Sequence, residues 1–318
     1  MIAVNITSGL GNNMFQYAAA RVIAEANGYH FIHKQARHHR FKKSSLKRLV
    51  KEIFSGPSQP QQKQLSQKDL VEYFELGCSN KWTIQLKRLV WFLTFVRRKI
   101  VVSPRRKVFR DQYQFEIFDN RVLMIKDWSL LHGSFQSSAY FNERRGDVVQ
   151  WFKLRKKYKK RLISLSKEID TSPSELCCLH VRRGDYLLQN KGLGLPSLGW
   201  CLPIEYYIEA ANKLPKNTKF IIVTDDVEYA SKNLNFLPIF HISTENNEAV
   251  DMHLFGLCKY NIIANSSFSW WGAWLNQQEE KVVIAPKNHI GWSAGVNIPF
   301  SFDSCIDDWV YIDIPKLF

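Results

Sequence analysis

A histidine, two arginines and an aspartate lie close together in the run His180-Val181-Arg182-Arg183-Gly184-Asp185. The apolar stretch from Leu176 to Val181 predicts a buried strand, and Gly184 allows the chain to turn where that strand ends. Open α/β sheets bind ligands at the carboxyl ends of their strands, so the two arginines would lie in a binding cleft. Because a guanidinium is planar, always charged and able to bind two phosphate oxygens at once, this pattern indicates a diphosphate site. The alternative is a salt-bridge cluster at a strand end.

Two later segments would converge on the same edge, since all strands of a parallel sheet point the same way. They are Thr224-Asp225-Asp226 and Asn265-Ser266-Ser267-Phe268-Ser269-Trp270. Serines that begin a helix can bind phosphate where the helix dipole also favours negative charge, or they can cap the helix, which explains one serine but not three. The aspartates could bind a metal, cap a helix, or accept hydrogen bonds from a base or ribose. His180 is either a hydrogen-bonded core residue or a phosphate ligand.

The amino-terminal segment predicts a strand at 2–6, a glycine turn, and a helix whose apolar residues recur every three or four positions up to Gly28. The turn Gly9-Leu10-Gly11-Asn12 would place backbone N–H groups where an anion or sugar could bind, although a purely structural turn is an equal alternative. Met14 occupies the third glycine position of the dinucleotide fingerprint. We therefore exclude a nicotinamide or flavin site.

Strand and helix patterns alternate after the polar linker at 171–174. The expected strands are 176–181, 220–223, 239–242, 261–264 and 282–285, and the expected helices are 204–214, 227–234, 249–258 and 270–276. This order predicts a parallel sheet. The linker predicts a boundary near residue 170 between an amino-terminal domain, 1–170, and a carboxyl-terminal domain, 171–318.

Composition indicates an ordered globular chain with a basic surface, because the 318 residues are 45% hydrophobic and carry a formal net charge of +15. Basic residues cluster at 34–48 and 153–161, either as solvated helix faces or as surfaces for an anionic membrane or, less readily, nucleic acid. The cysteines form no CxxC pair, which predicts free thiols in a reducing cytosol rather than a zinc or redox site. No signal peptide is visible, and the longest apolar run, 89–96, is too short to span a bilayer. We expect a cytoplasmic protein, soluble or peripheral at the inner face of the membrane.

Three blocks resemble the motifs of the α-1,2-fucosyltransferase family, glycosyltransferase family 11. They are Gly9-Leu10-Gly11-Asn12 with Met14-Phe15-Gln16-Tyr17-Ala18, His180-Val181-Arg182-Arg183-Gly184-Asp185-Tyr186, and Asn265-Ser266-Ser267-Phe268-Ser269-Trp270-Trp271-Gly272-Ala273-Trp274-Leu275. The blocks span residues 9 to 275 and leave a basic insert from about 41 to 102 unmatched. Asn13 departs from the family, which commonly has glutamine there.

The resemblance implies a GT-B-like α/β fold of two Rossmann-type domains, with the donor nucleotide bound mainly by the carboxyl-terminal parallel sheet and the acceptor by the amino-terminal domain. It also implies inverting transfer of L-fucose from GDP-fucose to the 2-hydroxyl of a terminal galactose, with no cofactor and no required metal. A galactoside or lipid-linked glycan of a bacterial surface polysaccharide is the expected acceptor. The alternatives are a fucosyltransferase of another linkage and a non-catalytic basic RNA-binding protein, although aromatic residues are not interleaved with the basic clusters.

In this interpretation Arg182 and Arg183 stabilise the charge that develops on the diphosphate, and Asp185 is the candidate general base. A carboxylate beside two guanidiniums is a weak base, so the alternative role of Asp185 is to hold the turn. The remaining candidates are donor-binding residues: Gly9, Gly11, Asn12, His180, Thr224, Asp225, Asp226, Asn265, Ser266, Ser267, Phe268, Ser269 and Trp270. No metal ligand and no nucleic-acid partner are expected.

Overall fold

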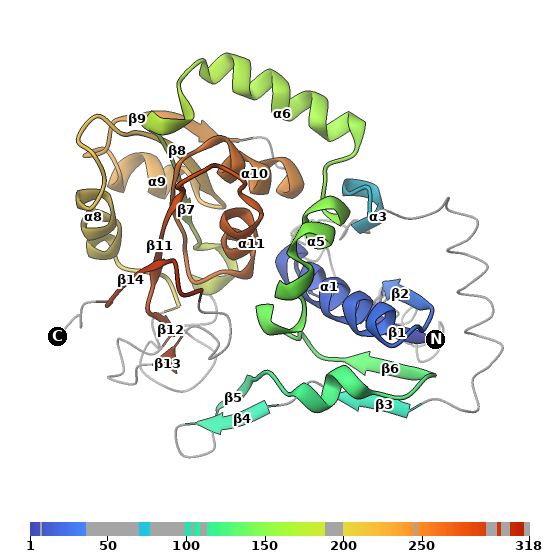
Figure 1. The fold of residues 1–318 in the computed structure, drawn as a ribbon. Helices are drawn as coiled ribbons and strands as arrows, with labels where there is room; N and C mark the ends of the chain where they lie inside the picture. The colour runs from blue at the N-terminus through green and yellow to red at the C-terminus, as the bar shows by residue number, and fades with distance from the viewer. Residues whose placement is uncertain are drawn as a thin grey trace, which may run out of the picture.

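The structure, a computed structural model, describes residues 1–6, 8–35, 70–76, 99–102, 105–108, 113–187, 200–244, 247–290, 298–299 and 306–314. Most of the basic cluster at 34–48, most of the insert at 41–102 and the segment at 82–96 lie outside the described residues. Figure 1 shows the two larger sheets, one in each half of the chain, with helices packed between them.

The amino-terminal sheet has the order β2-β1-β6-β3, and its strand pairs are parallel. Its strands are β1 (Ile2–Ile6), β2 (Phe31–Gln35), β3 (Lys99–Val102) and β6 (Ser129–His132). Helix α1 (Leu10–Ala26) covers β1 and ends at the C-cap Asn27, where Gly28 has a φ of +69°. The expected strand at 2–6 and the helix end at Gly28 are confirmed.

The other elements of this half connect the sheet to the rest of the molecule. They are α3 (Leu70–Tyr73), the antiparallel pair β4 (Arg105–Val108) and β5 (Tyr113–Glu116), the 3₁₀ turns η2 (Asn120–Met124), η3 (Ser138–Tyr140) and η4 (Asn142–Arg144), and helices α5 (Arg145–Trp151) and α6 (Lys156–Ile169). A 3₁₀ turn, η5 (Pro173–Glu175), then leads into the second sheet.

The carboxyl-terminal sheet has the order β14-β11-β10-β7-β8-β9, and its pairs are all parallel, as the sequence predicts. Its strands are β7 (Leu176–Val181), β8 (Lys219–Thr224), β9 (Ile239–Ser243), β10 (Tyr260–Ile262), β11 (Val282–Pro286) and β14 (Val310–Ile312). The helices are α8 (Ile204–Asn212), α9 (Val227–Asn233), α10 (Glu248–Leu254) with the 3₁₀ turn η6 (Phe255–Leu257), and α11 (Ser267–Leu275). A short antiparallel pair, β12 (Asn288–Ile290) and β13 (Ile298–Pro299), follows β11.

Helix α11 begins earlier than the sequence indicates, at Ser267 instead of Trp270. Ser266 caps it by accepting a hydrogen bond from the backbone N–H of Phe268. The polar first turn therefore belongs to the helix, although it lacks the apolar pattern that marks the rest.

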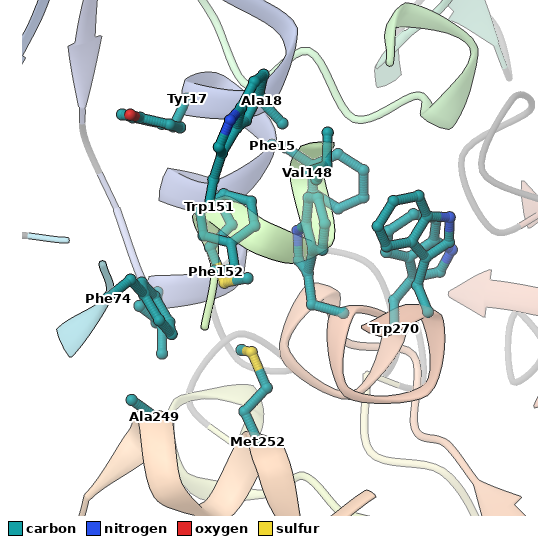
Figure 2. Close-up of a cluster of buried hydrophobic side chains, with 14 of the residues drawn as sticks. Phe15, Tyr17, Ala18, Phe74, Val148, Trp151, Phe152, Ala249, Met252 and Trp270 are labelled. Atoms are coloured by element: carbon teal, nitrogen blue, oxygen red, sulfur yellow. The ribbon is translucent and has the colours of Figure 1, made fainter. Parts of the chain in front are cut away.

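Helices α1 and α11 pack together across the two halves, with α1 supplying Phe15 and α11 supplying Trp270 and Trp271. The Phe15 ring centroid lies 4.6 Å from that of Trp270 and 5.0 Å from that of Trp271. Figure 2 shows this cluster continuing through Phe152 toward Met252 of α10. One hydrophobic core thus extends over both halves of the chain, and the division near residue 170 stays a prediction.

Gly11 allows this packing, because a Cβ at that position would lie 2.5 Å from the carbonyl carbon of Ser267 and 2.7 Å from the backbone nitrogen of Phe268. At the other end of α11, the Arg145 guanidinium donates to the Trp274 carbonyl and lies 4.1 Å from the Trp274 ring centroid. The amino-terminal half therefore holds α11 at both ends.

Gly11→Ala should lower the free energy of unfolding by about 1 to 3 kcal/mol, because backbone atoms of α11 would have to shift to admit the methyl group. Gly9→Ala is the matched control, since nothing lies within 4 Å of a Cβ at Gly9 and its φ is −73°. Urea unfolding of both variants measures the difference. Equal midpoints for the two variants would contradict the close approach.

Candidate active site

The arginine turn, residues 182–187, follows β7 at the carboxyl edge of the larger sheet and forms a single helical turn at 184–187. A Cβ at Gly184 would lie 2.5 Å from Oδ2 of Asp225, so glycine lets the turn approach the end of the neighbouring strand β8. The backbone N–H of Arg183 donates to Oδ1 of Asp225 at 2.8 Å. As predicted, the segments that follow β7 and β8 lie together.

Arg182 is held by two carboxylates. Its Nη2 lies 2.6 Å from Oδ1 of Asp185, and its Nη1 lies 2.9 Å from Oδ2 of Asp225. The Asp185 carboxylate is therefore already engaged within the turn. This geometry fits the alternative role of Asp185, which is to hold the turn.

Arg183 is held differently, by one carboxylate and an aromatic ring. Its Nε donates to Oδ2 of Asp226 at 3.1 Å, and its guanidinium carbon lies 3.5 Å from the ring centroid of Tyr229. Asp226 also caps α9 by accepting from the backbone N–H of Tyr229 at 3.0 Å, which confirms the predicted cap. Within the described residues, Nη1 and Nη2 of Arg183 have no hydrogen-bond partner, so a fixed guanidinium presents two open nitrogens to an anion.

His180 lies in β7 just before the arginine turn and is almost fully buried. Its ring packs against Phe268 of α11 at a centroid distance of 5.2 Å, and no described residue bonds its Nδ1. Burial, assisted by the charge of Arg182, lowers the pKa of His180 to about 3. The imidazole is therefore neutral at physiological pH and can offer a neutral N–H or an acceptor nitrogen near the start of α11.

The three serines of the third motif have internal partners. Ser266 caps α11, and the Ser269 hydroxyl, which is fully buried, bonds the carbonyls of Ala264 and Ser266 at 3.3 Å. The Ser267 hydroxyl donates to Oδ1 of Asn12 at 2.6 Å. Ser269 thus has internal hydrogen-bond partners, and Ser267 could contact phosphate only by giving up its bond to Asn12. The phosphate contacts of the three serines stay a prediction.

Gly11 and Asn12 lie at the contact between the two halves. Oδ1 of Asn12 accepts from Ser267 and also, at 2.7 Å, from Nε2 of Gln136, so Asn12 joins three segments of the chain. Gly9, by contrast, is exposed. The structural alternative for the glycine turn therefore accounts for Gly11 and Asn12.

Asn265 and Trp270 are fully buried. Nδ2 of Asn265 donates to the carbonyls of Trp200 and His289 at 2.8 and 2.6 Å, which ties the segment before α8 to strand β12. Trp270 packs in the aromatic core against Phe15, and its contact with the donor stays a prediction. Thr224 accepts from the backbone N–H of Asp226 at 3.0 Å and thereby shapes the turn that follows β8.

Two residues near the arginines were missed from the sequence, Tyr229 and Glu248. Glu248 begins α10, which follows β9 and so lies at the same edge of the sheet. Burial raises the pKa of this carboxyl, and the charge of Arg182 opposes that rise. The charge of Glu248 in turn adds to burial in raising the pKa of Tyr73 in the amino-terminal half. Although its side chain keeps an exposed part, Glu248 thus lies between the arginine turn and the other half of the molecule.

The structure bears on metal sites and membrane-spanning helices in the described residues only. In that part of the chain no group of three or more histidine, cysteine, aspartate or glutamate side chains is suited to hold a metal ion. No helix there is long and apolar enough to cross a bilayer. Cys177, Cys178, Cys201 and Cys258 are free thiols, as expected for the cysteines that the structure describes.

The α/β architecture, with a parallel sheet in each half of the chain, is of GT-B type. The fold resembles that of POFUT1 in complex with GDP, with a TM-score of 0.51, 10% identity and coverage of 89% of this chain and 97% of that chain. The family model described as "Glycosyl transferase family 11" matches residues 106–313, and the chain belongs to this family.

Two proteins of Escherichia coli are similar to the chain in sequence. The O-antigen biosynthesis glycosyltransferase WbnK is 27% identical, over 96% of this chain and 98% of its own length. An alpha-1,2-colitosyltransferase is 29% identical, over 75% of this chain and 82% of its own length. The chain is accordingly a glycosyltransferase.

His180 should make the protein less stable as the pH falls. Its pKa is about 3 in the folded protein against about 6.5 in the unfolded chain, so the unfolded state binds the extra proton between these values. The stability is present above pH 6.5 and is lost below it, by about 2 kcal/mol between pH 7 and pH 5 for this residue. Urea unfolding of wild type and His180→Asn at several pH values measures the difference in slope. Parallel stability curves would show that His180 is not buried in its neutral form.

Proposed function

We propose that this glycosyltransferase moves L-fucose from GDP-fucose to the 2-hydroxyl of a terminal galactose, with inversion at the fucosyl C1. The observation that carries this is Arg183, a guanidinium fixed on Tyr229 and Asp226 whose two terminal nitrogens have no hydrogen-bond partner among the described residues. Family membership and the motif resemblance support a fucosyl donor. The similarity to an alpha-1,2-colitosyltransferase supports the α-1,2 linkage and makes the colitosyl nucleotide the competing donor.

The transfer breaks the bond between C1 and the β-phosphate oxygen and forms a bond between C1 and the galactose oxygen. Negative charge grows on the departing diphosphate, and preorganised donors aimed at that charge lower the barrier. Arg183 provides such donors without reorganising, because its plane is already fixed. Arg182, held by Asp185 and Asp225, supplies a second positive charge beside it.

The first turn of α11 adds a further source of positive potential. Neither α1 nor α11 has an acidic residue in its first turn, and the two helices meet near their N-termini at Gly11 and Ser267. Helix N-termini favour negative charge. His180 connects this region to the arginines through its contact with Phe268. We propose that the diphosphate lies between Arg183 and this helix start, and that no metal ion is needed to neutralise it.

The proton of the acceptor hydroxyl must pass to a base, for which two carboxyls are candidates. Asp185, the candidate from the sequence, is already engaged by Arg182 at 2.6 Å within the turn. Glu248 has a pKa that burial raises toward the range that suits a general base, and it lies on the side of the amino-terminal half. We propose Glu248 as the base and Asp185 as the residue that positions Arg182.

The acceptor that we propose is a galactoside of a bacterial surface polysaccharide, in free or lipid-linked form. The similarity to an O-antigen biosynthesis glycosyltransferase supports this class of acceptor. Such a reaction places the protein in the cytoplasm or at the inner face of the membrane.

The donor assignment is tested by calorimetric titration of GDP-fucose with a chelator present, into wild type and Arg183→Ala. Binding by wild type should weaken about 10- to 100-fold in the variant, because hydrogen bonds to a charged group contribute about 1.5 to 3 kcal/mol. Arg161→Ala is the control, since Arg161 pairs with Glu168 on α6, away from the arginine turn. If folded wild type bound RNA but no guanosine nucleotide, the RNA-binding alternative would replace the proposal. If it bound GDP-colitose more tightly than GDP-fucose, the donor would be GDP-colitose.

Glu248→Gln should reduce kcat by about 100- to 10,000-fold while leaving the affinity for GDP-fucose nearly unchanged, as expected for loss of a general base. Asp185→Asn should instead weaken donor binding, because it releases Arg182. Single-turnover transfer to a galactoside, with linkage analysis of the product, measures both effects. A Glu248→Gln enzyme with normal turnover would return Asp185 to the role of base.

A further inference from the structure

Helix α6 (Lys156–Ile169) presents a strongly basic face to solvent. Between residues 153 and 170 the sequence has eight basic and two acidic side chains. Figure 1 shows α6 as an outer helix at the top of the molecule, running across from the side of α3 and α5 to the side of β9. A helix in this position is held by one face and leaves the opposite face free.

The buried face of α6 consists of Tyr158, Leu165 and Ile169. At 100° per residue, the row directly opposite consists of Lys156, Lys160, Ile163 and Lys167. All four are exposed, and Ile163 is 45% exposed. We call this row the lysine ridge. It spans about 16 Å along the helix, given a rise of about 1.5 Å per residue.

The positive charge of the lysine ridge is not compensated within the described residues. None of its three lysines forms an ion pair there, and the same holds for the exposed neighbours Lys153, Lys157 and Lys159. The acidic residue of the helix, Glu168, is engaged by Arg161 at 3.2 Å and by the Ser164 hydroxyl at 3.0 Å. The ridge is therefore open to an anionic partner.

The buried face connects α6 to the candidate active site. Tyr158 packs against Tyr73 at a ring-centroid distance of 5.4 Å, and α6 packs along α10, the helix that begins with Glu248. Glu248 interacts electrostatically with both Tyr73 and Arg182. The lysine ridge thus lies on the outer side of α6. Helix α10, which packs against α6, begins at Glu248, and Glu248 interacts with Arg182 of the arginine turn.

We propose that the lysine ridge docks the protein on a bilayer surface rich in anionic phospholipid. Lysines near such a surface are attracted to its negative headgroups, and the apolar Ile163 in the middle of the row can enter the boundary of the acyl chains. Docking through α6 would hold the edge that carries Glu248 and Arg182 at a fixed height above the membrane. This consequence rests on the proposed function: docking would favour transfer to a galactose that is linked to a lipid over transfer to one free in solution.

The composition of the ridge favours lipid over single-stranded nucleic acid. Proteins that bind single strands without sequence preference combine basic residues with aromatic side chains on which the bases stack. The exposed residues of α6 include no aromatic side chain, since Tyr158 is buried against Tyr73. A lysine row interrupted by an aliphatic residue matches an interfacial helix better.

The test is sedimentation of the full chain with vesicles made of equal parts phosphatidylglycerol and phosphatidylcholine, at low ionic strength. The combined variant Lys156→Gln, Lys160→Gln, Lys167→Gln should bind about 10- to 100-fold more weakly than wild type, because each lysine near an anionic surface contributes about 1 kcal/mol. Vesicles of pure phosphatidylcholine should bind neither protein. Added salt should weaken wild-type binding, since the attraction is screened.

A second combined variant, Lys213→Gln, Lys216→Gln, Lys232→Gln, is the matched control, because it removes the same charge from exposed lysines of the other half. It should retain nearly all of the vesicle binding. Transfer to a water-soluble galactoside by the ridge variant should equal that of wild type, which separates docking from the proposed activity. The proposal would be overturned if wild type failed to bind anionic vesicles, or if the two variants lost vesicle binding equally. It would also be overturned if wild type bound an RNA oligonucleotide in place of vesicles.

Discussion

The close approach of α1 and α11 is the constraint on which the arrangement of this molecule depends. It requires a glycine at position 11, because backbone atoms of Ser267 and Phe268 occupy the space of a side chain there. Once the backbones touch, Phe15 reaches Trp270 and Trp271, and Asn12 reaches Ser267. These contacts join the two halves through an apolar core instead of a solvated hinge (Figure 2). The same contact brings the N-termini of α1 and α11 together beside the arginine turn. One helix contact therefore both stabilises the fold and adds positive electrostatic potential to the candidate site.

The arginine turn shows how a fold can hold positive charge ready for a ligand. Two guanidiniums close together repel each other, and Asp185, Asp225 and Asp226 offset that repulsion. The division of roles is unequal. Both terminal nitrogens of Arg182 contact carboxylates. Arg183 is held by its Nε and by the ring of Tyr229, and its two terminal nitrogens have no hydrogen-bond partner in the part of the chain that the structure describes. An arginine fixed by its edge and its face loses little further entropy when an anion binds.

Much of the carboxyl-terminal half could be predicted from the sequence, because strands such as 176–181 are continuous apolar runs and the alternation with helices permits few topologies. The contacts of polar residues were harder to predict. A serine that caps a helix, one that bonds a neighbouring carbonyl and one that binds phosphate have the same local pattern, so the internal hydrogen bonds of Ser269 could not be foreseen. Gly11 was recognised as a turn residue, but no local signal shows that its neighbour is the start of α11. Glu248 was missed for a related reason, since only the packed structure brings it near Arg182 and Tyr73.

The protonation states of the residues around the site follow from their surroundings. His180 lies among apolar groups beside Arg182, so protonation would bury a second positive charge, and the ring stays neutral. Of the groups discussed here, Glu248 has both a pKa raised by burial and an exposed part through which a substrate hydroxyl could reach it. In the proposed mechanism, His180 stays neutral beside the diphosphate, and the transfer step follows the protonation of the Glu248 carboxyl.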